Sequence, residues 1–104
     1  MHARLSTFQA ARDASVGLER ILEREVLSEF EHIDGYSGMV GLLDRASGKC
    51  VVISFWESDA AMRASDEHAT RLRSTVGQRL RSTETPTVER YEVVLSEVRT
   101  PVHT

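Results

Sequence analysis

Residues 49–57 read KCVVISFWE, a stretch rich in the β-branched and aromatic side chains that strands favour. Successive side chains of a strand point to opposite faces of the sheet. Apolar side chains therefore fall on both faces of this strand: Val51, Ile53 and Phe55 on one, and Cys50, Val52 and Trp56 on the other. A sheet built around such a strand must be covered on both sides.

The preceding stretch, Tyr36 to Arg45, predicts another strand of the same kind. Its apolar residues are also divided between two faces, with Met39 and Leu43 on one and Val40 and Leu42 on the other. The intervening Ala-Ser-Gly at 46–48 supplies a short turn. We therefore expect these two strands to form a hairpin.

Before the hairpin, residues 2–9 alternate in the manner of a first strand, and a helix is predicted to follow. Asp13 or Ser15 is expected to cap the N-terminus of this helix. Its apolar residues recur mostly every four positions, at Leu18, Leu22, Val26, Phe30 and Ile33. Asp34-Gly35 is expected to end the helix, because glycine readily takes the left-handed conformation.

After the hairpin, Ser58 is predicted to cap a second helix, with Asp59 in its positively polarised first turn. The apolar row of this helix is Met62, Ala69, Leu72, Val76 and Leu80. Ser65 interrupts the row, so the pattern allows either a continuous helix or one that is broken near this residue. Pro86 stops further helix, and residues 88–98 predict a last strand carrying Tyr91, Val93 and Leu95.

This order of elements predicts an α+β, ferredoxin-like split β-α-β-β-α-β fold. Right-handed crossovers would place both helices on one face of a four-stranded antiparallel sheet. We expect residues 1–98 to form one domain and residues 99–104 to form a C-terminal tail. The uncovered apolar face predicts a homodimer that pairs through the sheet, because a second copy is the simplest cover. The alternative is that the C-terminal segment folds over this face.

Composition narrows the possible partners. The chain has 104 residues and a net charge of −3, so no basic field favours nucleic acid or an acidic membrane. No apolar run approaches the roughly 20 residues that span a membrane. The single cysteine, Cys50, cannot form a disulfide within the chain, and we expect a cytoplasmic location.

Three short segments resemble the antibiotic biosynthesis monooxygenase family of the dimeric α+β barrel superfamily: GYSG at 35–38, FWES at 55–58 and PTVERYEV at 86–93. This resemblance implies a homodimer whose two sheets face each other, with a cavity between sheet and helices in each subunit. Some family members oxidise electron-rich aromatic polyketides or quinols with O₂ and no cofactor. Others bind and degrade haem, and others have no established activity.

The chain departs from the family pattern at functional positions, because it contains no asparagine. The haem-degrading relatives use an asparagine of strand one with a tryptophan and a histidine of helix two. Here Ser65 aligns with that tryptophan, so the resemblance disfavours haem degradation. The polyketide-oxidising relatives use an asparagine near Val52, which weakens a direct transfer of their mechanism.

The leading hypothesis is a cofactor-independent monooxygenase acting on a small aromatic or quinol-like substrate in an apolar pocket. The substrate must lose a proton and its developing negative charge must be steadied. Trp56 is the candidate pocket wall, Tyr36 the hydrogen-bond donor and His68 the base. In the structural alternatives, Trp56 belongs to the core and His68 is solvated. Tyr91 would likewise lie in the core, with its hydroxyl at an edge.

We expect no cofactor and no metal. The chain has no G-x-G-x-x-G or P-loop motif, and its four histidines are too widely spaced for a typical ligand set. Arg71, Arg73, Arg79 and Arg81 spread around the second helix and do not form a nucleic-acid surface. A second class of function is a non-catalytic small-ligand-binding or stress-related dimer that uses the same pocket.

Overall fold

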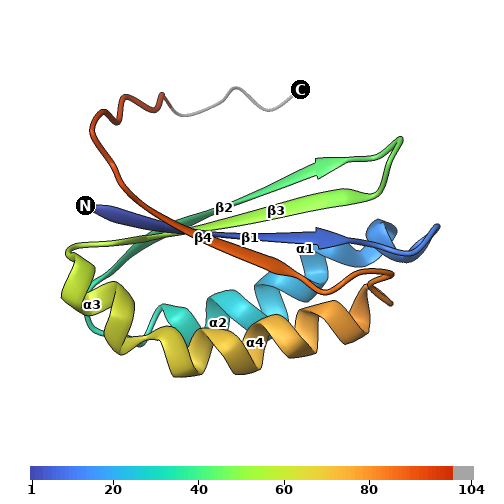
Figure 1. Cartoon of the computed structure of the whole chain (residues 1–104), viewed down its shortest axis with the longest axis horizontal. Helices are drawn as coiled ribbons and strands as arrows, with labels where there is room; N and C mark the ends of the chain where they lie inside the picture. Colours follow the sequence, from blue (N-terminus) through green and yellow to red (C-terminus); the bar gives the residue numbers. More distant parts are fainter. Residues whose placement is uncertain (100–104) are drawn as a thin grey trace.

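The computed structural model, which describes residues 1–99, is a four-stranded antiparallel sheet with all its helices on one face (Figure 1). The strands are β1 His2–Gln9, β2 Tyr36–Asp44, β3 Lys49–Trp56 and β4 Thr87–Glu92, in the spatial order β2-β3-β1-β4. This arrangement confirms the predicted α+β, ferredoxin-like class. The hairpin strands β2 and β3 each end one residue earlier than the sequence predicted.

The first helical segment changes its pitch along its length. It consists of a 3₁₀ turn η1 (Ala14–Gly17), α1 (Leu18–Ile21), a π-helix η2 (Leu22–Leu27) and α2 (Ser28–Phe30). Leu18, Leu22, Val26 and Phe30 are all buried against the sheet, as predicted. Their constant spacing of four exceeds the 3.6 residues of an α-helical turn, and the wider π turn keeps them on one face.

The predicted cap of this segment is wrong. Asp13 adopts a left-handed conformation, with φ of 80°, and its side chain makes no capping hydrogen bond. Ser15 lies inside the 3₁₀ turn, which begins at Ala14. The chain turns sharply at Asp13, so its side chain does not face the free N–H groups of the following turn.

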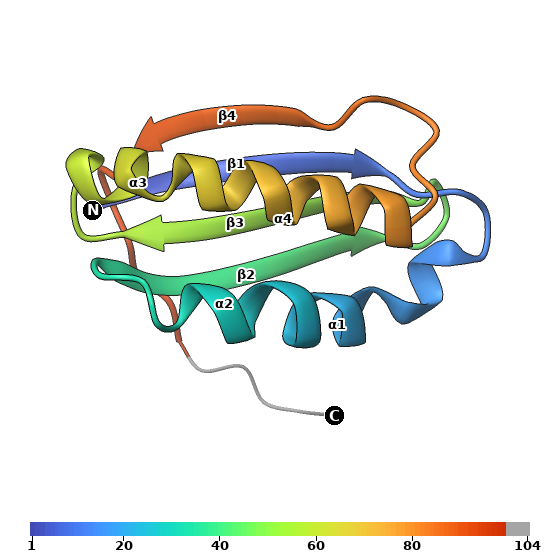
Figure 2. The same cartoon turned by 90° about the horizontal axis from the view of Figure 1, so that it is seen from below.

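The second helical segment is broken, at the serine that interrupts its apolar row. Ser58 caps α3 (Asp59–Ala64) by accepting a hydrogen bond from the Ala61 N–H at 3.0 Å. Ser65 separates α3 from α4 (Asp66–Arg79). It is fully buried, and its hydroxyl donates to the Met62 carbonyl at 2.6 Å. Figure 2 shows α4 and α1–α2 side by side across the strands.

The predicted end of the first helical segment at Asp34-Gly35 is wrong, because α2 ends at Phe30 and its C-cap is Glu31. Gly35 lies just before β2 and has a φ of 84°. A Cβ at this position would lie 2.5 Å from the Cβ of Ala61 at the start of α3. The glycine therefore meets the need for a left-handed backbone and also lets the chain before β2 approach α3 closely.

The last strand is shorter than predicted, because β4 ends at Glu92 and not at Val98. Its partner β1 begins at His2, which pairs with Glu92, and the Val93 N–H donates to the Met1 carbonyl at 2.9 Å just beyond this pair. The following segment leaves the sheet on the side away from the helices, with Val94, Leu95 and Val98 more than 80% exposed (Figure 1). The tail predicted at 99–104 lies, beyond its first residue, outside the described residues.

Tyr91 does not occupy the core position predicted for it. It lies on the open face of the sheet and is 51% exposed, and its hydroxyl donates to the Glu89 carboxylate. Val40 and Leu42 share this open face and are 42% and 49% exposed. No helix within residues 1–99 is both long enough and apolar enough to cross a membrane.

Candidate functional site

A cavity of about 30 Å³ lies between the helices and the sheet. Most of its wall is apolar: Leu22, Val26 and Phe30 from the first helical segment, Ala69, Leu72 and Val76 from α4, and Phe8 and Val52 from the sheet. The remaining wall is polar and consists of Arg4, Ser6, Ser54 and Arg73. The cavity therefore has an apolar body and a cationic side.

Arg4 is the most buried charge at this site, at 2% exposure. It stands on the central strand β1, directly opposite Ser54 of β3 and Arg90 of β4. Its Nη2 donates to the Met62 carbonyl at 2.6 Å, to the Ser65 hydroxyl at 2.8 Å and to Asp66 Oδ1 at 2.5 Å. The Nε and Nη1 atoms of Arg4 are buried and have no hydrogen-bond partner within the described chain.

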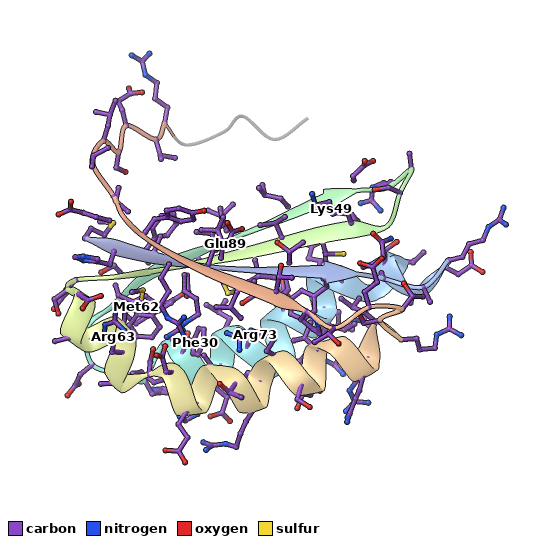
Figure 3. The ribbon with its side chains drawn as sticks, viewed as in Figure 1. Phe30, Lys49, Met62, Arg63, Arg73 and Glu89 are labelled. Carbon is purple, nitrogen blue, oxygen red and sulfur yellow. The ribbon has the colours of Figure 1, made fainter. Side chains whose placement is uncertain are left out.

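Arg73 approaches the cavity from the opposite layer. Figure 3 shows its side chain between α4 and the sheet, near Phe30. Its Nε donates to the Ser6 hydroxyl of β1 at 3.1 Å, and the residue is partly buried. Within residues 1–99, no carboxylate forms an ion pair with Arg73. It is therefore a cation held against the sheet by a neutral partner.

The charges around the cavity are unequal in number. Asp66 pairs with both Arg4 and Arg90, at 2.5 and 3.2 Å. Burial acts to raise the pKa of Asp66, but hydrogen bonds and charge from the two arginines outweigh it and lower that pKa. Burial also lowers the pKa of Arg73, and the neighbouring Arg4 and Arg90 lower it further. Asp66 thus pairs with two of the three guanidinium groups, and Arg73 has no ionic partner within residues 1–99.

Trp56, the predicted pocket wall, is completely buried but is not among the residues that line the cavity. Its ring packs edge-on against Phe30 and Tyr36, with centroids 5.4 and 5.7 Å apart. Its Nε1–H donates to the Ser54 hydroxyl at 2.9 Å, and the Arg4 Cζ lies 5.6 Å from its ring centroid. In this structure the indole N–H is engaged within the protein.

Tyr36 and His68 also lie off the cavity wall. Tyr36 is half-buried, and burial together with the charge of Glu31 raises the pKa of its phenol. His68 of α4 contacts the first helical segment, where its Nε2 is 3.0 Å from the carboxylate of Glu29 on α2. The structure brings Tyr36 and Trp56 together and leaves His68 apart from both. The catalytic roles assigned to these residues stay predictions.

Sequence reasoning missed Arg4 and placed Arg73 only in a dispersed set of helix arginines. A signal for Arg4 was present in the alternation of residues 2–9, where Arg4 and Ser6 share a face with Phe8. A strand face that carries a large aromatic residue is expected to point towards the core and not to solvent. A charged residue on that face is therefore unusual. No group of three or more histidine, cysteine or acidic side chains within residues 1–99 could hold a metal ion.

The sequence comparisons identify relatives of undetermined function. No family model matches the chain. Two uncharacterised proteins of Mycobacterium tuberculosis H37Rv are similar: Rv2557 is 33% identical over 94 residues, 89% of this chain and 41% of that protein. Rv2558 is 31% identical over 104 residues, 99% of this chain and 43% of that protein. The chain thus spans about two fifths of the length of these curated relatives.

Comparison with solved structures gives neighbours of similar fold at lower sequence identity. A Streptomyces coelicolor monooxygenase in complex with nanaomycin D has a TM-score of 0.74 and 15% identity, covering 95% of this chain and 92% of that one. SnoaB, a cofactor-independent oxygenase of Streptomyces nogalater, has a TM-score of 0.65 and 20% identity, covering 91% and 94% of the two chains. The M. tuberculosis protein Rv0793 has a TM-score of 0.64 and 21% identity, covering 94% and 98%. The chain therefore has the fold of the antibiotic biosynthesis monooxygenases.

Proposed function

We propose that the protein is a cofactor-independent monooxygenase that acts on a small aromatic or quinol-like substrate. The observation that carries this proposal is the cavity between helices and sheet, which has apolar walls and a cationic side formed by Arg4 and Arg73. Two neighbours of the same fold, named as a monooxygenase and a cofactor-independent oxygenase, support it.

Such a reaction needs a substrate that can lose a proton and donate electrons to O₂. Positive charge beside a phenol or an enol stabilises its anion and so lowers its pKa. Arg73, which forms no ion pair within residues 1–99, is placed to supply this charge. For an anthrone-type methylene, one atom of O₂ becomes the carbonyl oxygen of the product and the other leaves as water with the two methylene protons.

The size of the cavity adds a condition. About 30 Å³ accommodates little more than one water molecule, whereas an engineered cavity that binds benzene measures about 150 Å³. An aromatic substrate therefore requires the helical layer to move away from the sheet. The π-helix η2 carries Leu22 and Val26 of the wall, and π segments often occur at functional sites.

Oxygen uptake tests the proposal. The protein, treated with a chelator, is given a panel of hydroquinones and anthrones, and O₂ consumption is measured with an electrode. We expect uptake above the buffer rate for at least one compound. Ala69→Leu fills the cavity and should abolish uptake, while Ala64→Leu, at an exposed position of α3, should not. Circular dichroism establishes that both variants fold. Uptake that equals the buffer rate for every compound would end the oxygenase proposal.

We also propose that two copies pair through the open faces of their sheets. Val40 and Leu42 on β2 share this face with Val51 and Ile53 on β3. Burying one such side chain is worth about 1.5–3 kcal/mol, so a monomer forgoes a large stabilisation. The described part of the C-terminal segment leaves Val94, Leu95 and Val98 exposed, which supports a second copy as the cover over the alternative of an intramolecular one.

The second candidate function is a non-catalytic small-ligand binder with the same dimeric arrangement. It is favoured by the small cavity and by the position of His68, which contacts Glu29 on the outer surface and not the cavity. Saturable ligand binding at the cavity without oxygen uptake would select this function over the first.

A further inference from the structure

Positive charge exceeds negative charge beside the cavity. Arg4 and Arg73 line the cavity, and Arg90 lies opposite Arg4 on β4. Asp66 is the only carboxylate within the described chain that forms an ion pair with any of these three arginines. Buried and half-buried charges in proteins are normally paired, because an unpaired charge in a low-dielectric site is costly. This excess is therefore compatible with an anion as the missing partner.

Hydrogen-bond donors are also left over. Arg4 is 2% exposed, and its buried Nε and Nη1 have no acceptor within the described chain. Among the described residues, Arg73 makes one side-chain hydrogen bond, from its Nε to the neutral hydroxyl of Ser6. Buried donors without acceptors are rare in folded proteins and point to an absent partner. Arginine donors match the acceptors of a planar oxyanion well.

We propose that this cavity recognises the carboxylate of a small organic acid, which the Arg73 guanidinium binds and the charge of Arg4 attracts. The apolar side chains of Leu22, Val26 and Val76 line the same cavity and receive the hydrocarbon part of the acid. Because about 30 Å³ accommodates little more than one water molecule, even a short-chain acid requires the helical layer to move, although by less than a bulky phosphate ester would. This inference rests on the proposed function only in taking the cavity as the ligand site.

The test compares each acid with its neutral amide. Acetate and propionate, and separately acetamide and propionamide, are titrated into ¹⁵N-labelled protein at constant ionic strength, with chloride as the control anion. Backbone and arginine Nε–H signals are followed by NMR. We expect the propionate signals to saturate in the millimolar range, with affinity at least about ten-fold above that of propionamide. The shifts should centre on Arg73, Ser6 and Val76.

Variants of Arg73 test whether propionate binds in the cavity. Arg73→Gln should reduce propionate affinity at least about ten-fold, and Arg73→Lys, which keeps the charge, should retain part of it. Arg71→Gln, two positions away on the exposed side of α4, should leave the affinity unchanged. Equal binding of acid and amide, equal shifts with chloride, or undiminished affinity in Arg73→Gln would each overturn the proposal.

The acid-binding test and the oxygen-uptake test can fail independently of each other. Selective acid binding without oxygen uptake would refute the oxygenase and leave the carboxylate site standing. Oxygen uptake with neutral hydroquinones, in a protein that does not distinguish propionate from propionamide, would refute the carboxylate site and leave the oxygenase standing.

Discussion

Arg4 of the central strand and Asp66 at the start of α4 are joined by a hydrogen bond of 2.5 Å, although 62 positions separate them in the sequence. The bond connects the sheet to the helical layer at the break in the second helical segment. Arg4 also donates to Ser65, the residue that separates α3 from α4. Asp66 contacts Arg90 as well, so one carboxylate keeps two arginines of neighbouring strands side by side.

Replacing Asp66 by asparagine should destabilise the fold. Arg4 would lose the one ionic partner it has within residues 1–99, and its guanidinium would face Arg90 without a compensating charge. Because Asp66 is partly exposed and its charge partly screened, we expect a loss of about 1–2 kcal/mol in the free energy of unfolding. Urea denaturation measures it. Asp59→Asn, which removes the exposed first-turn acid of α3 that pairs with Arg63, should have a much smaller effect. Equal effects of the two substitutions would contradict this role of Asp66.

The same pair should make stability depend on acid pH. The folded protein lowers the pKa of Asp66, because Arg4 and Arg90 together outweigh the opposing effect of burial. A lowered pKa in the folded state stabilises the protein above the unfolded pKa of about 4, and this contribution is lost as the pH falls through the folded value.

The stability advantage of the wild type over Asp66→Asn should therefore be complete above about pH 5 and should shrink towards pH 3. Urea titrations of both proteins at a series of pH values measure it. A difference that stays constant over this range would show that Asp66 is not ionised preferentially in the fold.

Gly35→Ala should be strongly destabilising for two reasons that act together. The residue has φ of 84°, which costs a residue with a Cβ, and the new Cβ would lie 2.5 Å from that of Ala61. We expect a loss of about 1–3 kcal/mol, seen as a lower thermal midpoint by circular dichroism. Gly17→Ala is the matched control, because no atom lies closer than 4.0 Å to its added Cβ. A midpoint for Gly35→Ala as high as that of the control would refute the close approach of α3.

A charge on the open face should separate the proposed dimer. Leu42→Glu places a carboxylate among the apolar side chains of β2 and β3, where pairing would bury it at a high cost. Sedimentation velocity at micromolar concentration should give a dimer for the wild type and a monomer for this variant. Val16→Glu, at an exposed position before α1, should sediment as the wild type does. A monomeric wild type would remove the proposed interface.

Much of the fold could be predicted because it depends on local patterns. The two-sided apolar strand at 49–57, the turn at 46–48 and the four-residue spacing from Leu18 to Phe30 are read within short windows. Ser65 signalled the helix break in the same way, because a polar residue interrupted an apolar row. These elements need no knowledge of distant partners.

The end of β4 and the cationic side of the cavity depend on partners far away in the sequence. The last strand ends at Glu92, which pairs with His2 at the start of β1, and an apolar pattern alone does not contain that limit. The burial of Arg4 depends on acceptors from α3 and α4. The chemical type of a side chain does not reveal its surroundings. Trp56 lies where it packs against Phe30, and His68 lies where it contacts Glu29.

The proposed ligand site lies between the helices and the sheet. Intermolecular NOEs to a bound acid test this position of the ligand most directly. With saturating propionate and methyl-labelled protein, we expect NOEs from the ligand to the methyl groups of Val26 and Val52, which line the cavity from the helical layer and from the sheet. NOEs confined to Val40 and Leu42 on the open face, or none at saturation, would contradict the account.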